Sequence, residues 1–118
     1  MHDISNRKHQ ESPMKISHLV ALSVLAVAMP ALAADLSVSQ SNQTFSSPNL
    51  AVHVGDKVVF HNNDTVTHNI TVKSGDGDAD DLGLQKPGVA VNYKFEAAGA
   101  YRVVCSIHPR MKMTVNVQ

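Results

Sequence analysis

Two alternating segments and the loop between them make up residues 100–117, AYRVVCSIHPRMKMTVNV. Side chains alternate between the two faces of a β-strand, so Cys105 shares a face with a tyrosine and a valine, and Met113 lies on the apolar face of the second segment. The pattern predicts two strands, 100–105 and 112–117, with the thiol directed inward and Met113 in the core. Met111 lies in the loop and is free to face a metal.

The loop carries three side chains that bind metals, Cys105, His108 and Met111, at three-residue intervals. A thiolate, two imidazoles and a weak axial thioether form a blue-copper site, which accepts both Cu(I) and Cu(II). The second imidazole has a candidate upstream in His68, within Thr67-His68-Asn69-Ile70. The sequence therefore predicts one copper ion, cycling between Cu(II) and Cu(I), with His68, Cys105, His108 and Met111 as its ligands.

Other interpretations of these residues are weaker. A lone cysteine is often a small buried hydrophobe, and a methionine near a strand often fills a core. Zinc is the competing metal, but it rarely takes a thioether ligand. A lone cysteine with a distant histidine can also be a catalytic pair. The chain shows no obvious substrate cleft and is very short for a hydrolase, so we expect it not to be an enzyme.

The amino-terminal region has the pattern of a secretion signal. Lys15 precedes an apolar stretch, Leu19 to Met29, and Ala31-Leu32-Ala33 is a small-residue cleavage site. We expect residues 1–33 to be a signal peptide, with cleavage after residue 33 or 34, and Met14 is an alternative start. An uncleaved anchor is disfavoured because the apolar stretch is short for a membrane span. The expected location is the periplasm.

Residues 34–118 are expected to form a single copper-binding domain. This segment has 85 residues, enough for one small domain. Seven lysines and arginines oppose eight aspartates and glutamates there, a net charge of −1 with neutral histidines. So balanced a charge indicates neither nucleic acid nor an anionic membrane surface as a partner. The single cysteine excludes an internal disulfide.

Short strands separated by turn residues fill this segment, and no helical period is present. The predicted strands are 36–38, 50–54, 57–62, 68–73, 89–95, 100–105 and 112–117. Such a series is typical of a β-sandwich. The other histidines in these strands, His53 and His61, are interpreted as surface residues. The acidic stretch 75–81 is interpreted as a solvated loop, with a partner-recognition surface as the alternative.

The chain resembles the cupredoxin family of type 1 blue copper proteins. The resemblance rests on Val54-Gly55-Asp56-Lys57-Val58, the His68-Asn69 pair, Gly99-Ala100-Tyr101 and the loop 105–111. The short spacing from histidine to methionine is closest to amicyanins, with plastocyanins next. The resemblance implies an all-β, small antiparallel Greek-key β-sandwich of eight strands or slightly fewer, with the copper near one end.

The same resemblance implies several roles for individual residues. The two histidines bind copper through ring nitrogens, and Asn69 ties its side chain to the ligand loop near Ser106. Backbone N–H groups donate to the thiolate and raise the reduction potential. His108, beside Pro109, presents a ring edge at the surface as the electron port.

These observations predict a periplasmic one-electron carrier that works between redox protein partners. The resemblance raises a periplasmic dehydrogenase as donor and a c-type cytochrome as acceptor. We expect a monomer without a stable membrane anchor. A copper delivery or storage protein would use the same ligands and is the leading alternative, and a metal-free structural sandwich is a third hypothesis.

Overall fold

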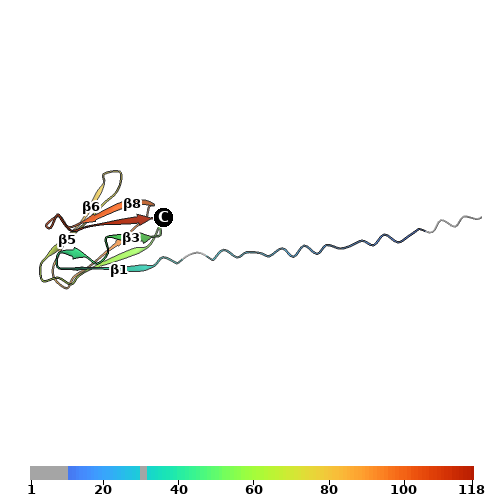
Figure 1. The fold of residues 1–118 in the computed structure, drawn as a ribbon, viewed down its shortest axis with the longest axis horizontal. Helices are drawn as coiled ribbons and strands as arrows, with labels where there is room; N and C mark the ends of the chain where they lie inside the picture. The colour runs from blue at the N-terminus through green and yellow to red at the C-terminus, as the bar shows by residue number, and fades with distance from the viewer. Residues whose placement is uncertain (1–10, 30–31) are drawn as a thin grey trace, which may run out of the picture.

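Nine strands form two sheets in the computed structural model, which describes residues 11–29 and 32–118 (Figure 1). The strands are β1 (Asp35–Ser41), β2 (Thr44–Phe45), β3 (Asn49–Val52), β4 (Lys57–Asn62), β5 (His68–Lys73), β6 (Ala79–Gln85), β7 (Ala90–Lys94), β8 (Gly99–Val104) and β9 (Lys112–Val117). The described residues contain no helix. The prediction of an all-β sandwich is confirmed.

The two sheets have the strand orders β2-β1-β4-β7 and β3-β9-β8-β5-β6. Most neighbouring strands are antiparallel, as expected, but β1 pairs with β4 and β3 pairs with β9 in parallel. These parallel pairs join strands that are separated by other elements along the chain, since a parallel pair needs a crossover connection.

Apolar residues that alternate along the strands fill the space between the sheets. The buried cluster combines Val58 and Phe60 of β4 with Val103 of β8 and Val115 of β9. The ring of Phe95 packs edge-on against Tyr93 and Tyr101 at 4.8 and 5.2 Å between centroids. Aromatic pairs favour this edge-to-face arrangement. The core therefore joins the two sheets, and the loop 105–111, called the ligand loop below, lies between β8 and β9.

Three predicted strands, 57–62, 68–73 and 112–117, have the bounds that the sequence indicated, and the other predicted strands overlap β1, β3, β7 and β8. Two strands were not predicted. The solvated loop assigned to residues 75–81 is wrong in part, because β6 begins at Ala79. This strand lies at a sheet edge and is mostly exposed. Edge strands often carry charges, so the apolar alternation that marks a buried strand is missing.

The other unpredicted strand, β2, follows β1 through a two-residue turn. Asn42 and Gln43 have φ angles of 51° and 55°, and Ser41 pairs with Thr44 across the turn. Two successive positive φ angles are the geometry that a type I′ hairpin turn requires. The turn directs the backbone of Gln43 toward the segment that precedes β5, where it contributes to the candidate site.

Residues 11–29 extend away from the sandwich (Figure 1). They form neither helix nor strand, and their side chains are exposed. No helix among the described residues is long and apolar enough to cross a membrane. Residues 1–10 and Ala31 of the expected cleavage site lie outside the described residues.

Candidate metal centre

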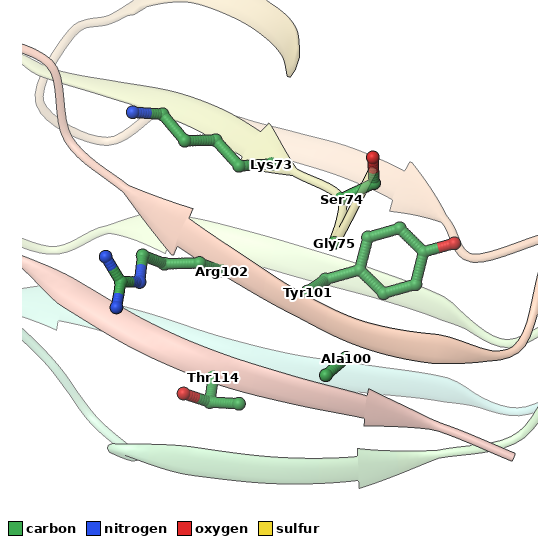
Figure 2. A pocket seen from close by; sticks show the side chains of 7 residues that line it. All are labelled: Lys73, Ser74, Gly75, Ala100, Tyr101, Arg102 and Thr114. Carbon is green, nitrogen blue, oxygen red and sulfur yellow. The ribbon is translucent and has the colours of Figure 1, made fainter. Parts of the chain in front are cut away.

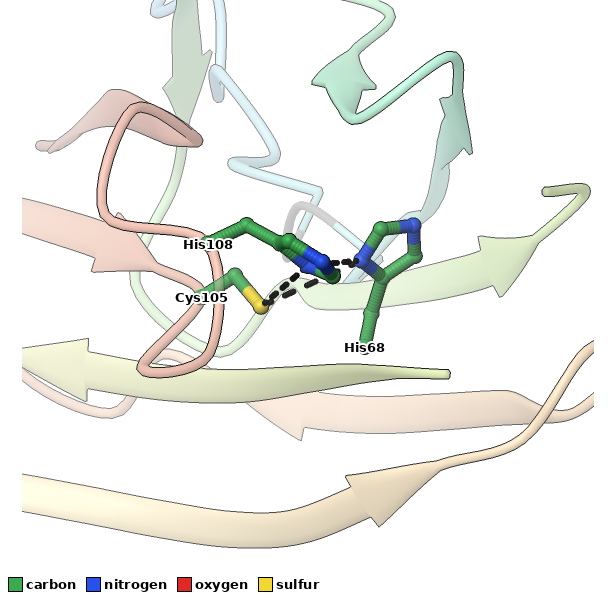
Figure 3. A group of neighbouring side chains, drawn as sticks. All are labelled: His68, Cys105 and His108. Carbon is green, nitrogen blue, oxygen red and sulfur yellow. Dashed lines mark hydrogen bonds between the residues drawn. The ribbon is translucent and has the colours of Figure 1, made fainter. Parts of the chain in front are cut away.

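His68, Cys105 and His108 converge at one end of the sandwich (Figure 3). The Nδ1 atoms of the two histidines are 3.1 Å apart. The sulfur of Cys105 lies 3.6 Å from Nδ1 of His108 and 3.9 Å from Nδ1 of His68. Three of the four residues predicted as ligands therefore place their donor atoms around one point.

The spacing of these donor atoms fits a single bound metal ion. Zinc, for comparison, binds imidazole nitrogen at about 2.0–2.1 Å and thiolate sulfur at about 2.3 Å. Two nitrogens bound to one such ion can therefore be up to about 4 Å apart, and a nitrogen and a sulfur up to about 4.4 Å apart. All three observed distances are below these limits. One thiolate and two imidazoles in a trigonal set are the donors typical of blue copper.

The ligand loop is closed by its own backbone. The N–H of Met111 donates to the carbonyl of His108 at 2.9 Å, and the N–H of Cys105 donates to the carbonyl of Met111 at 3.1 Å. Met111 is buried in this loop, at 1% exposure. Met113 lies in β9 opposite Val103 and belongs to the core, as its strand phase predicted. These backbone bonds hold Met111 in the same closed loop as Cys105 and His108, and its side chain also belongs to the buried apolar cluster.

His68 is the first residue of β5 and is completely buried. Its Nε2 lies 2.9 Å from Oδ2 of Asp64. A carboxylate accepts hydrogen bonds, so the proton of the imidazole belongs on Nε2 and the lone pair of Nδ1 faces Cys105 and His108. Carboxylate partners of this kind orient a metal-binding histidine and raise its basicity.

Asp64 is held in place by backbone donors as well as by His68. Oδ2 also accepts the N–H of Gln43 at 2.8 Å, and Oδ1 accepts the N–H of Thr65 at 2.8 Å. The hydrogen bond from Gln43, followed by those from His68 and Thr65, lowers the pKa of Asp64. Asp64 is not among the residues that the sequence predicted for the site. Its position four residues before His68 is the one signal that the sequence offers.

Asn69 connects β5 to the ligand loop. Its N–H donates to the sulfur of Cys105 at 3.3 Å, and its Oδ1 accepts the N–H of Ser106 at 3.2 Å. Both contacts agree with what the resemblance implied. Oδ1 also accepts the hydroxyl of Thr71 at 2.7 Å, and Nδ2 donates to Asp81 at 2.7 Å. The side chain thus fixes the distance between the strand that carries His68 and the turn that carries Cys105.

The three donors differ in their access to solvent. His68 and Cys105 are buried, whereas His108 is half-buried. The neighbouring Ile107 is 45% exposed. His53 and His61 are not part of the cluster: the side chain of His53 is 79% exposed beside Asp56, and His61 lies 3.5 Å from the hydroxyl of Ser37. Of the clustered donors, His108 is the one that reaches the surface.

Comparison with known proteins agrees with the donor set. Residues 32–118 match the family described as copper binding proteins of the plastocyanin/azurin family. The chain belongs to this family. It is therefore a cupredoxin, and the family and its relatives support a single copper site and a role in copper electron transfer.

The relatives of this cupredoxin include amicyanins and methylamine utilization proteins. The chain is 30% identical over 98 residues to the methylamine utilization protein MauL of Methylorubrum extorquens, covering 83% of this chain and 86% of that protein. It is 29% identical over 101 residues to amicyanin-alpha of the same organism, covering 84% and 85%. The reduced Cu(I) form of an amicyanin variant superposes with a TM-score of 0.66 at 29% identity, covering 71% of this chain and 82% of that one.

Proposed function

We propose that this cupredoxin is a periplasmic one-electron carrier whose copper is bound by His68, Cys105, His108 and Met111. The observation that carries the proposal is the convergence of two imidazole nitrogens and a thiol sulfur within 4.8 Å of one another. Met111 is proposed as the weak axial ligand because it lies buried in the same loop as Cys105 and His108 and carries the thioether that such a site uses.

The residues around the site hold the donors in one arrangement. Bound copper supplies the one-electron chemistry, as Cu(II) or Cu(I). Asp64 holds the ring of His68, and Asn69 holds both the sulfur of Cys105 and the backbone of Ser106. A site fixed by such contacts changes little between two oxidation states, so little reorganisation opposes electron transfer.

His108 is proposed as the port through which electrons enter or leave. Its ring combines a donor nitrogen directed inward with partial exposure at the surface. The exposed Ile107 and Pro109 surround it. A partner that contacts this edge would approach the metal without opening the buried site.

The compartment and the partners follow from the amino-terminal sequence and the relatives. Residues 1–33 are proposed as a cleaved signal peptide and residues 34–118 as the mature domain. The start of the family match at residue 32 supports this division. Because two relatives are named amicyanin-alpha and methylamine utilization protein, we propose a periplasmic dehydrogenase as electron donor and a c-type cytochrome as acceptor, with the carrier itself monomeric.

Copper titration of the purified protein tests this function. One equivalent of Cu(II) should produce an intense blue colour and a type 1 electron paramagnetic resonance spectrum, and ascorbate should bleach the colour. Cys105→Ser should abolish the colour, because the thiolate is lost, whereas Ser106→Ala is the matched control and should remain blue. A colourless protein with one copper bound would contradict the proposal.

Copper delivery or storage is the alternative, and the same donors would serve it. The burial of His68 and Cys105 favours the carrier, because a metal held by buried donors has little access to an incoming ligand. Competition with a Cu(I) chelator separates the two functions. A carrier should release Cu(I) far more slowly than it exchanges electrons with a c-type cytochrome, and a delivery protein should show the opposite order.

A further inference from the structure

Cationic side chains gather on the outer face of the β3-β9-β8-β5-β6 sheet. Lys73 of β5 lies directly opposite Arg102 of β8. Lys112 of β9 comes two residues before Thr114, the partner of Arg102, so it lies diagonally from Arg102. The three cations are exposed. Figure 2 shows Lys73 and Arg102 on the same side of the sheet, with both side chains extended in the same direction.

We call the surface formed by Lys73, Arg102 and Lys112 the basic groove. Like charges directly opposite each other across two strands repel. Among residues 11–29 and 32–118, none of the three takes part in an ion pair with a carboxylate. The folded domain therefore has a cluster of positive charges here that no ion pair among its described residues neutralises, so the cluster can bind an anionic partner.

The two acidic residues of the adjoining edge strand, Asp80 and Asp81, do not neutralise the basic groove. The carboxylate of Asp80 accepts a hydrogen bond from the hydroxyl of Tyr93. Asp81 of β6 lies opposite Thr71, in the row of residues that continues to Val104 and Lys112. Its Oδ1 accepts hydrogen bonds from Nδ2 of Asn69 and from the N–H of Gly83, at 2.7 and 2.8 Å. This carboxylate is thus engaged in holding the metal centre.

A second pair of cations on the other sheet shows the contrast. Lys57 of β4 lies directly opposite Lys94 of β7. Asp35 lies 3.3 Å from Lys57, and Glu96 lies 4.0 Å from Lys94. The fold therefore neutralises one cross-strand pair of cations and leaves the other without an ion pair.

The basic groove is concave and leads to the metal centre. A hollow lined by its three cations also reaches Cys105, Ser106 and Pro109. Two more hollows adjoin it across the sheet, since Arg102 lines all three, and Figure 2 shows one of them. The concavity spans several strands, which is more than a small anion would occupy. Cys105, whose thiolate is a proposed copper ligand, is one of the residues that line this hollow.

We propose that the basic groove docks the acidic face of a redox protein. The inference rests on the proposed function and names the charge of one partner. In the reducing direction, one electron leaves the cofactor of the partner, which is oxidised, and enters the copper site, where Cu(II) becomes Cu(I). A protein is favoured over an anionic membrane because the basic groove is a hollow, which a protruding acidic protein surface can enter and a flat bilayer surface cannot.

The test compares two double variants of the copper-loaded protein with equal changes in charge. Lys73→Glu/Arg102→Glu reverses the basic groove, and Lys57→Glu/Lys94→Glu reverses the neutralised pair on the other sheet. The probe is cytochrome c with succinylated lysines, which is acidic, and native basic cytochrome c is the comparison. Calorimetric titration at low salt measures binding, and stopped-flow absorbance measures the rate of electron transfer.

With the acidic probe, the groove variant should bind about tenfold or more weakly and transfer electrons about tenfold or more slowly, since charge steering has this magnitude. The rate measured for this variant should also no longer depend on the salt concentration. The control variant should stay within about twofold of the wild type. Lys112→Glu alone should show a smaller loss in the same direction, which guards against misfolding of the double variant.

Vesicles of phosphatidylglycerol are titrated in the same way, as an anionic membrane. Three results would overturn the proposal: equal losses in both double variants, no loss in the groove variant, or binding that depends on the groove only with the vesicles. The colour of the wild-type protein is read separately. A colourless copper-loaded protein would overturn the proposed function, while the calorimetric titration would still test the groove.

Discussion

Asp64 and His68 form a buried pair in which Oδ2 of the carboxylate lies 2.9 Å from Nε2 of the imidazole. The side chain of Asp64 is 10% exposed and that of His68 is fully buried. The pair connects the turn of the first hairpin to the metal centre, because the same oxygen accepts the N–H of Gln43. The orientation of a proposed copper ligand is therefore determined by residues from two other segments.

Asp64→Asn should weaken Cu(II) binding and raise the reduction potential. Without the carboxylate, the imidazole of His68 is a poorer electron-pair donor, and this weakens the binding of Cu(II) more than that of Cu(I). Partners of this kind contribute about 10–100-fold to metal affinity. Each tenfold loss of preference for Cu(II) raises the potential by about 59 mV for one electron. Spectroelectrochemistry measures the change. Asp35→Asn, which alters an exposed carboxylate, is the control, and equal potentials in the two variants would contradict the role of Asp64.

Asn69→Ala should destabilise the folded protein by about 1–3 kcal/mol, because the buried hydroxyl of Thr71 and the partly buried N–H of Ser106 lose their acceptor. Thr71→Val removes only one of these bonds and should lower the free energy of unfolding by about 1 kcal/mol. Urea unfolding of both metal-free variants measures the difference. Equal stabilities of the two variants would show that Asn69 does not hold the ligand loop.

Met111→Leu should change the colour of the copper form and raise its reduction potential, because a weak axial donor to Cu(II) is lost. Met113→Leu replaces a core residue of β9 by one of similar volume and should lower the stability by less than about 1.5 kcal/mol without changing the spectrum. Optical spectra and potentials of both variants test the axial ligand. A spectral change confined to the Met113 variant would reverse the assignment.

The secreted protein should begin at Ala34. The N–H of Ala34 donates to Oδ1 of the buried Asp56 at 2.9 Å. Cleavage after Ala33 would turn this donor into a charged amino group, and charge-assisted hydrogen bonds are stronger than neutral ones. Intact mass spectrometry of protein isolated from the periplasm identifies the first residue. A chain that begins at Asp35 would lack this contact and would contradict the prediction.

Asp56 should make the stability sensitive to acid. Hydrogen bonds from the N–H groups of Ala34 and then His53 lower its pKa. The ionised form is thus favoured by folding, so this stabilisation is present above the unfolded pKa of about 3.9 and is lost as the pH falls through the lower folded value. Asp56→Asn should be less stable at neutral pH and lose less stability between about pH 5 and pH 3. Thermal unfolding across this range, with Asp35→Asn as control, measures the effect.

Local sequence pattern was sufficient for most of the fold. Alternation placed Met113 in the core and Cys105 on the inner face of its strand, and both residues are buried. Alternation could not identify β6, because most of this edge strand is exposed and its one buried residue, Gln85, is polar. It also could not identify the parallel pairing of β1 with β4, which depends on how distant segments pack.

The sequence by itself determined the donor types proposed for the metal centre, because Cys105, His108 and Met111 occupy one short loop. Only the tertiary structure decided how the distant residues take part. His68 reaches the loop because β5 pairs with β8, and Asp64 reaches His68 with the help of the first hairpin. The basic groove likewise exists only once three strands lie side by side. Donor chemistry belongs to individual side chains, whereas their distances depend on the pairing of strands far apart in the chain.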